Sequence, residues 1–286
     1  MNQIWQNFKK PIRNSLKYAK ALVKGYPFHY ANFQSPDDND QYLYKWIESI
    51  TPIPDRGTSE IRANRIWNLQ LAAQRIDCLN IAPQKIFSFS DRIGEPTRAN
   101  GFREAPVFVR GQVLTDVGGG LCLIATNVFN TFLYAGCEIL ERHCHSIDAY
   151  GESRFYELGQ DAAVANGYKD LIVRNHSQIP LQLRFQVFAE EGKVESSLWG
   201  SAPKPWQIKV ESQIIQQLHP PNPQYLSGWI VETSRYLKSG LGSSSPWQRD
   251  YATVSCYISA LCQVITNGGA KRRYLSNGSG LSQIKN

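Results

Sequence analysis

The chain has 286 residues, of which 42% are hydrophobic and 19% are charged. This composition is typical of a globular protein with a substantial core, and it excludes disordered, collagen-like and coiled-coil proteins. No run of about 18 apolar residues occurs, so the sequence offers no membrane-spanning helix.

The net charge of +7 is concentrated at the two ends of the chain. Residues 1–34 carry six basic and no acidic side chains, and residues 271–286 carry four basic and no acidic ones, which leaves −3 for residues 35–270. This distribution argues against nucleic acid as a partner. The basic ends are suited to peripheral contact with an acidic membrane surface, or are simply solvated. No apolar secretory core follows the basic N-terminus, so we expect a cytoplasmic protein, at most peripheral at the inner face of the membrane.

The first ninety residues predict two helices and a strand. Apolar residues at helical spacing among lysines predict a short amphipathic helix over 12–26, lying either on a membrane or on the domain. Thr58 or Ser59 is a suitable N-cap for a helix over 60–78 that has one apolar face. Alternating side chains then predict a strand over Ile86–Ser90.

Later segments are mostly strands around one apolar helix. That helix starts near Cys122 and ends at Gly136, and Glu138–His145 follows it as a predicted strand. Further strands are predicted at Val107–Val109, Gln112–Leu114, 171–173, 181–187, 208–210, 229–236 and 250–257. Because helices and strands mix without a βαβ rhythm, we predict an α+β fold with a mixed or antiparallel sheet.

Three regions follow from this organisation. Residues 1–57 form a basic N-terminal extension and a lead-in segment, 58–200 form the main domain, and 201–286 form a β-rich C-terminal extension with a basic tail.

The most unusual stretch places three glycines directly before Leu121 and Cys122. Gly118, Gly119 and Gly120 allow positive φ angles and close approach of the backbone to a substrate. A thiol at the start of a helix has a lowered pKa, and the free N–H groups beside it can receive an oxyanion. The pattern therefore fits a nucleophilic cysteine, and a tight turn beside a buried cysteine explains it equally well.

Two of the five histidines, His143 and His145, lie close together in the sequence. On a strand they point to the same face, so either one can serve as the base that activates Cys122. Asp161 is placed to orient that histidine as the third member of a triad, or to cap a turn. A zinc site made of Cys122, His143 and His145, with Asp161 as an added ligand, is a weaker alternative because HExxH and paired CxxC motifs are absent.

Five short motifs occur in an order that resembles the VanW family, named from vancomycin-resistance gene clusters. The resemblance covers roughly residues 60–190. The motifs are Ile86–Phe89, Gly118–Cys122, Glu141–Ser146, Gly159–Ala162 and Asp170–Asn175.

The resemblance implies a function at the bacterial cell envelope. Some VanW domains are understood to act as cysteine-dependent L,D-transpeptidases on peptidoglycan stem peptides. The resemblance places the family's cysteine on Cys122, its histidine on His145 and its acidic position on Asp161. His143 could share the base role with His145. Peptidoglycan peptide or precursor is then the expected partner, and the mechanism requires no cofactor.

One departure from the family pattern concerns Leu123. VanW-like proteins usually have glutamine directly after the cysteine, and this chain has leucine. If that glutamine holds the oxyanion or the substrate amide, the activity is weakened here. A non-catalytic protein that binds an envelope precursor is therefore the main alternative to an acyl-transfer enzyme.

Overall fold

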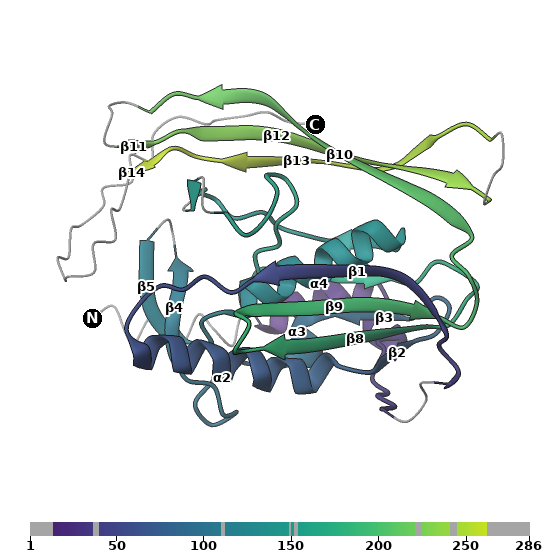
Figure 1. Cartoon of the computed structure of the whole chain (residues 1–286), viewed down its shortest axis with the longest axis horizontal. Coiled ribbons are helices and arrows are strands. Elements are labelled where there is room, and N and C mark those ends of the chain that lie inside the picture. Colours follow the sequence, from purple (N-terminus) through teal and green to yellow (C-terminus); the bar gives the residue numbers. More distant parts are fainter. Residues whose placement is uncertain are drawn as a thin grey trace.

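The computed structural model describes residues 14–36, 40–109, 112–148, 150–151, 154–220, 225–240 and 245–261. Its named elements combine helices with antiparallel ladders, which confirms the α+β class (Figure 1). In chain order they are η1 (Tyr26–His29), β1 (Tyr44–Pro52), α2 (Ser59–Ile76), β2 (Leu79–Ile81), β3 (Ile86–Ser88), α3 (Phe89–Ile93), β4 (Glu104–Val109), β5 (Gln112–Val117), α4 (Leu121–Ala135), β6 (Glu138–Glu141), β7 (Ile172–Arg174), β8 (Leu181–Phe188), β9 (Lys193–Gly200), β10 (Trp206–Leu218), β11 (Tyr225–Leu226), β12 (Gly228–Ser239), β13 (Gln248–Tyr257) and β14 (Ala260–Leu261).

Helix α4 is the centre of the domain. Twelve of its fifteen residues are buried, because it packs against β1 and β9 of the four-stranded sheet β1-β9-β8-β2 and also against β6. Its buried polar side chains find partners on that sheet. Asn127 donates to the carbonyl of Ser49 and to the hydroxyl of Thr51, and the hydroxyls of Thr131 and Ser196 lie 2.5 Å apart. These bonds set the direction of α4 relative to the sheet.

Helix α2 begins as the sequence predicted. Thr58 is its N-cap, and its hydroxyl oxygen accepts a hydrogen bond from the amide of Ile61 at 3.3 Å. Leu69 and Ile76 on the apolar face are fully buried, and the helix packs against β8.

The C-terminal sheet β10-β12-β13 lies across one side of the domain (Figure 1). Arg235 of β12 anchors it, since this buried guanidinium donates to the carbonyls of Leu133 and Cys137 at the end of α4. Asp250 of β13 balances the charge, 2.7 Å from Arg235 Nη2. Trp206 Nε1 also donates to the carbonyl of Ala135 at 2.8 Å. A cation at the C-terminal end of a helix is favoured by the helix dipole.

Two predicted strands are shorter than expected. The strand over Ile86–Ser90 ends at Ser88, because the Ser88 hydroxyl accepts the amide of Asp91 and starts α3. The strand over Glu138–His145 ends at Glu141, after a shift in its register with β7. The prediction that both histidines share one strand face is therefore wrong.

Strand β1 lies in a region for which the sequence predicted only an extension and a lead-in segment. It pairs antiparallel with β9 from Tyr44 opposite Gly200 to Pro52 opposite Lys193. The predicted division of the chain into 1–57, 58–200 and 201–286 stays a prediction, although residues before 58 and after 200 contribute to the same core.

The N-terminal helix occupies residues 14–23 of the described chain and contacts the domain. Lys17 Nζ lies 3.1 Å from Asp170 Oδ2 and 2.9 Å from Ser90 Oγ. Residues 1–13 of the basic segment 1–34, and the whole basic segment 271–286, fall outside the described residues. Within the described part of the chain, every helix is too short or too polar to cross a bilayer.

We expect Gly119→Ala to destabilise the fold, because the residue lies against the backbone of β4. An added Cβ would meet the carbonyl carbon of Ala105 at 2.5 Å and the carbonyl oxygen of Pro106 at 2.6 Å. Backbone atoms of a hairpin cannot retreat cheaply, so the expected loss is about 3 kcal/mol, measured by chemical denaturation. Gly192→Ala is the control, since its Cβ meets no atom within 4 Å. Its left-handed backbone costs only about 1 kcal/mol. Equal losses in the two variants would contradict the crowding argument.

Candidate functional site

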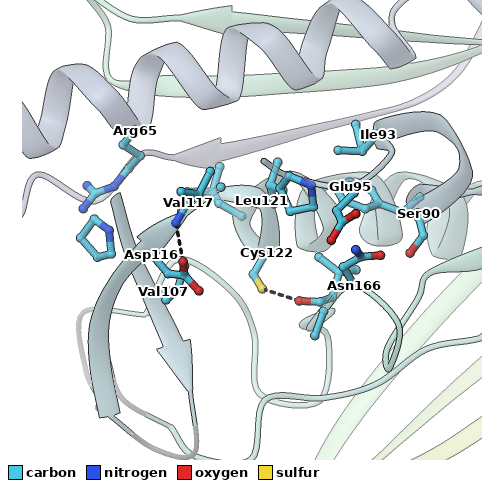
Figure 2. Close-up of a pocket in the computed structure, with 18 of the residues that line it drawn as sticks. Arg65, Ser90, Ile93, Glu95, Val107, Asp116, Val117, Leu121, Cys122 and Asn166 are labelled. Atoms are coloured by element: carbon cyan, nitrogen blue, oxygen red, sulfur yellow. Dashed lines mark hydrogen bonds between the residues drawn. The ribbon is translucent and has the colours of Figure 1, made fainter. Parts of the chain in front are cut away.

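Cys122 is the second residue of α4 and opens into a cleft of about 700 Å³. Its side chain is partly buried, and Sγ lies 3.5 Å from the carbonyl oxygen of Val164. Figure 2 shows the sulfur between two groups of lining residues, with Arg65 and Asp116 on one side and Glu95 and Asn166 on the other. The thiol therefore meets solvent and any bound molecule at the start of a helix.

The three glycines before the helix have different structural roles. Gly120 is the N-cap of α4 with φ +104°, and Gly118 has φ +89°, backbone conformations that other residues rarely adopt. Both line the cleft. Gly119 faces β4 instead, and its carbonyl oxygen accepts a hydrogen bond from Asn68 Nδ2 at 3.0 Å. Two of the three predicted glycines thus border the space beside Cys122, and the third supports them from behind.

His145 and Asp161 extend from the cysteine into the protein. His145 Nδ1 lies 2.5 Å from Asp161 Oδ2, and the backbone amide of His145 donates to the same oxygen at 2.7 Å. Because Nδ1 is engaged, Nε2 is the ring nitrogen that remains to interact with Cys122, and both side chains line the same cleft. The structure therefore brings three of the sequence-predicted side chains together in the row Cys122–His145–Asp161, in which His145 and Asp161 are hydrogen-bonded and His145 lines the cleft together with Cys122.

The electrostatics of the row favour the charged forms. Burial raises the pKa of Cys122, but the hydrogen bond and positive charge of His145 outweigh burial and lower it overall. Burial lowers the pKa of His145, but Asp161 and Cys122 raise it to about 10. Burial raises the pKa of Asp161, but its hydrogen bonds and the charges of His145 and Arg142 lower it to about 2. At neutral pH His145 is therefore an imidazolium and Asp161 an ionised carboxylate, and the lowered pKa of Cys122 increases its thiolate fraction.

Sequence reasoning missed two residues of this network. Arg142 is buried and donates from Nη2 to Asp161 Oδ1 at 2.8 Å and from Nε to the Asp161 carbonyl at 2.6 Å. Tyr257 of β13 donates its hydroxyl to Asp161 Oδ1 at 2.5 Å. Arg142 lies inside the motif Glu141–Ser146 and had a signal there. The sequence contains no signal for Tyr257, because this residue lies 96 positions after Asp161.

His143 is not part of this row. Its Nε2 lies 3.1 Å from Glu141 Oε1, its side chain is 38% exposed, and it is absent from the cleft lining. The structure therefore gives no contact through which His143 would share the base role with His145. Among the described residues, no group of three or more His, Cys, Asp or Glu side chains is arranged to hold a metal ion. The zinc alternative has no support from this geometry.

The cleft walls are largely apolar, with a few polar groups. Leu123 is buried and lines the cleft directly beside Cys122. Arg65 is also buried, and its guanidinium donates to the carbonyls of Pro54 and Arg56. Such a mixture suits an organic molecule or a short peptide held by a small number of polar contacts.

Comparisons with known proteins concern the region around this site. Residues 64–199 match the family model described as VanW like protein. The chain is 32% identical over 121 residues to the uncharacterized protein YoaR of Bacillus subtilis, which covers 42% of this chain and 39% of that protein. It is 30% identical over 121 residues to the Vancomycin B-type resistance protein VanW of Enterococcus faecalis, which covers 42% of this chain and 44% of that protein. The chain thus matches less than half the length of either relative, and no solved structure matches it.

We expect Cys122 to react with iodoacetamide at lower pH than an ordinary thiol. A lowered pKa means that the thiolate forms earlier as pH rises, so at about pH 6 Cys122 should react faster than Cys256, whose side chain is more exposed. Peptide mapping by mass spectrometry gives the rate at each cysteine.

Replacing each histidine separates their roles in this assay. His145→Ala removes the main groups that oppose the effect of burial and should raise the pKa of Cys122, which slows its alkylation near neutral pH. His143→Ala is the matched control and should leave the rate unchanged, because His143 contacts Glu141. An equal effect of both substitutions would contradict the row described above.

Proposed function

We propose that this chain, whose residues 64–199 match the family model described as VanW like protein, catalyses acyl transfer through Cys122. The observation that carries the proposal is the row Cys122–His145–Asp161, which ends in a thiol at the mouth of a cleft of about 700 Å³. A nucleophile, a base in contact with it and a carboxylate that orients the base are the parts that covalent catalysis needs.

The first half of the reaction forms a thioester. The Cys122 thiolate attacks the carbonyl carbon of a peptide amide, so a C–S bond forms and the carbonyl oxygen takes the displaced electron pair. Free N–H groups at the start of α4 are suited to receive this oxyanion. When the intermediate collapses, the C–N bond breaks and the leaving nitrogen takes the proton from His145 Nε2.

The second half transfers the acyl group to an amine. The acceptor amine attacks the thioester carbon and gives a proton to His145 Nε2. The C–S bond then breaks, which restores the thiolate and leaves a new amide. Asp161 stays ionised throughout and holds the imidazole through Nδ1. Atoms and charges balance without a cofactor or an external oxidant.

We propose peptidoglycan stem peptides or their precursors as the substrate class. This part rests on the family resemblance, and it is supported by a relative described as a vancomycin resistance protein. The cleft volume is adequate for a short peptide, and its apolar walls with a few polar groups suit such a chain.

A binding protein without catalysis is the second candidate, and Leu123 is the observation that favours it. Its apolar side chain lies where VanW-like proteins usually carry glutamine, so the cleft has no amide there to hold an oxyanion or a substrate. Such a protein would keep the cleft and recognise an envelope precursor.

Cys122→Ala should abolish transpeptidation of a tetrapeptide stem onto an amine acceptor, measured by mass spectrometry of the products. The substitution removes the covalent step, so the expected loss is several orders of magnitude, while the melting temperature stays nearly unchanged. His145→Ala should cost nearly as much because the two act as one unit, and Cys256→Ala is the matched control. If wild type and Cys122→Ala form the transpeptidation product at the same rate while both bind stem peptide, the enzyme proposal is wrong and the binding-protein proposal stands.

Leu123→Gln tests the departure from the family pattern. An added amide donor beside Cys122 should raise the transpeptidation rate, by up to about 10²-fold if it reaches the oxyanion. Leu123→Met keeps the apolar character and similar volume, so it should leave the rate near that of the wild type. A rate for Leu123→Gln no higher than for Leu123→Met would show that leucine has not cost this protein an oxyanion donor.

A further inference from the structure

We infer that Tyr257 and Ser255 are positioning residues that complete the Cys122 site from outside the region matched by the family model. The inference rests on the proposed acyl-transfer function and extends it. Both residues belong to β13 of the C-terminal sheet, whereas the match ends at residue 199.

The direction of the Tyr257 hydrogen bond follows from its two partners. The backbone amide of Gly159 donates to the hydroxyl oxygen at 2.9 Å, so that contact uses a lone pair of the oxygen. The hydroxyl proton is therefore free to go to Asp161 Oδ1 at 2.5 Å. Tyr257 is fully buried, so no water competes for either bond.

Every oxygen of the Asp161 side chain is in use. Oδ2 accepts hydrogen bonds from the ring Nδ1 and the backbone amide of His145. Oδ1 accepts hydrogen bonds from Arg142 and Tyr257. Two fixed donors on Oδ1 prevent the carboxylate from rotating about its Cβ–Cγ bond. The plane of the carboxylate in turn sets the direction in which the His145 ring faces Cys122.

Ser255 acts on the same network through Arg142. Its hydroxyl oxygen accepts a hydrogen bond from Arg142 Nη1 at 2.6 Å, and its side chain is fully buried. Ser255 and Tyr257 are two positions apart on one strand, so they point to the same face. One face of β13 therefore supports both the carboxylate and its arginine partner.

The sheet also contacts the two loops that carry the site. A Cβ on Gly159 would meet Thr233 Oγ1 of β12, so this glycine lets the loop before Asp161 lie directly on the sheet. The amide of Ile258 donates to the carbonyl of Ser146 at 2.8 Å, next to His145. The sheet thus holds both the aspartate and the histidine segments.

The test compares Tyr257→Phe with Tyr251→Phe in the full chain. Tyr251 lies on the same face of β13, and the hydrogen bonds to the Asp161 carboxylate that the structure describes come from His145, Arg142 and Tyr257, so Tyr251→Phe should leave them all in place. The first readout is the pH profile of Cys122 alkylation by iodoacetamide. Loss of one donor on Asp161 should slow alkylation at about pH 6 roughly tenfold and shift the profile to higher pH.

The second readout is the split between kcat and KM in the stem-peptide assay. Tyr257 is absent from the cleft lining, so its removal should lower kcat and leave KM close to that of the wild type. Ser255→Ala is the second variant, and it should shift the alkylation profile in the same direction by a smaller amount. If Tyr257→Phe does not fold, the alkylation profile of Ser255→Ala tests the positioning role in its place.

The outcomes separate this inference from the proposed function. If wild-type Cys122 alkylates at low pH and both β13 variants keep that profile, the positioning role is wrong while the nucleophile stands. A lower melting temperature with an unchanged pH profile also overturns it, because that result describes a structural role alone. If wild-type Cys122 reacts no faster than Cys256, the proposed function itself fails.

Discussion

The buried carboxylate of Asp161 is the constraint on which the site depends. An unpaired charge in the protein interior costs roughly several kcal/mol of folding free energy, so the fold must supply hydrogen-bond donors for both oxygens. They come from two segments far apart in the sequence: Arg142 and His145 after β6, and Tyr257 of β13. Satisfying one carboxylate therefore fixes the relative position of the domain and the C-terminal sheet.

Helix α4 links this network to the cysteine. Thr126, one turn after Cys122, accepts a hydrogen bond from the amide of Ala162 at 3.0 Å and so holds the residue next to Asp161. The opposite end of the helix is held by Arg235, which donates to the carbonyl of Leu133 in the last turn and to that of Cys137 just beyond the helix. Since partners fix both ends, the distance between the thiol and the histidine is set by packing rather than by a flexible loop.

The chemistry that this arrangement supports depends on two opposing effects at Cys122. Burial alone would keep the thiol neutral and inert, whereas the imidazolium of His145 stabilises the thiolate. The imidazolium persists because Asp161 stays ionised beside it. Leu123 places an apolar side chain in the cleft wall directly after Cys122, so no polar group is available at that position.

The sequence by itself determined the features that depend on neighbouring residues. Helical spacing and the Thr58 cap predicted α2, and the glycines before Cys122 predicted the start of α4, because caps and periodicity are local. Three members of the site were named from motifs. Only the tertiary structure decided that the β6 strand ends at Glu141, which turns His143 away from Cys122. It alone brought Tyr257 to Asp161, 96 positions earlier in the chain, since such a contact arises from the packing of a whole sheet and leaves no local pattern.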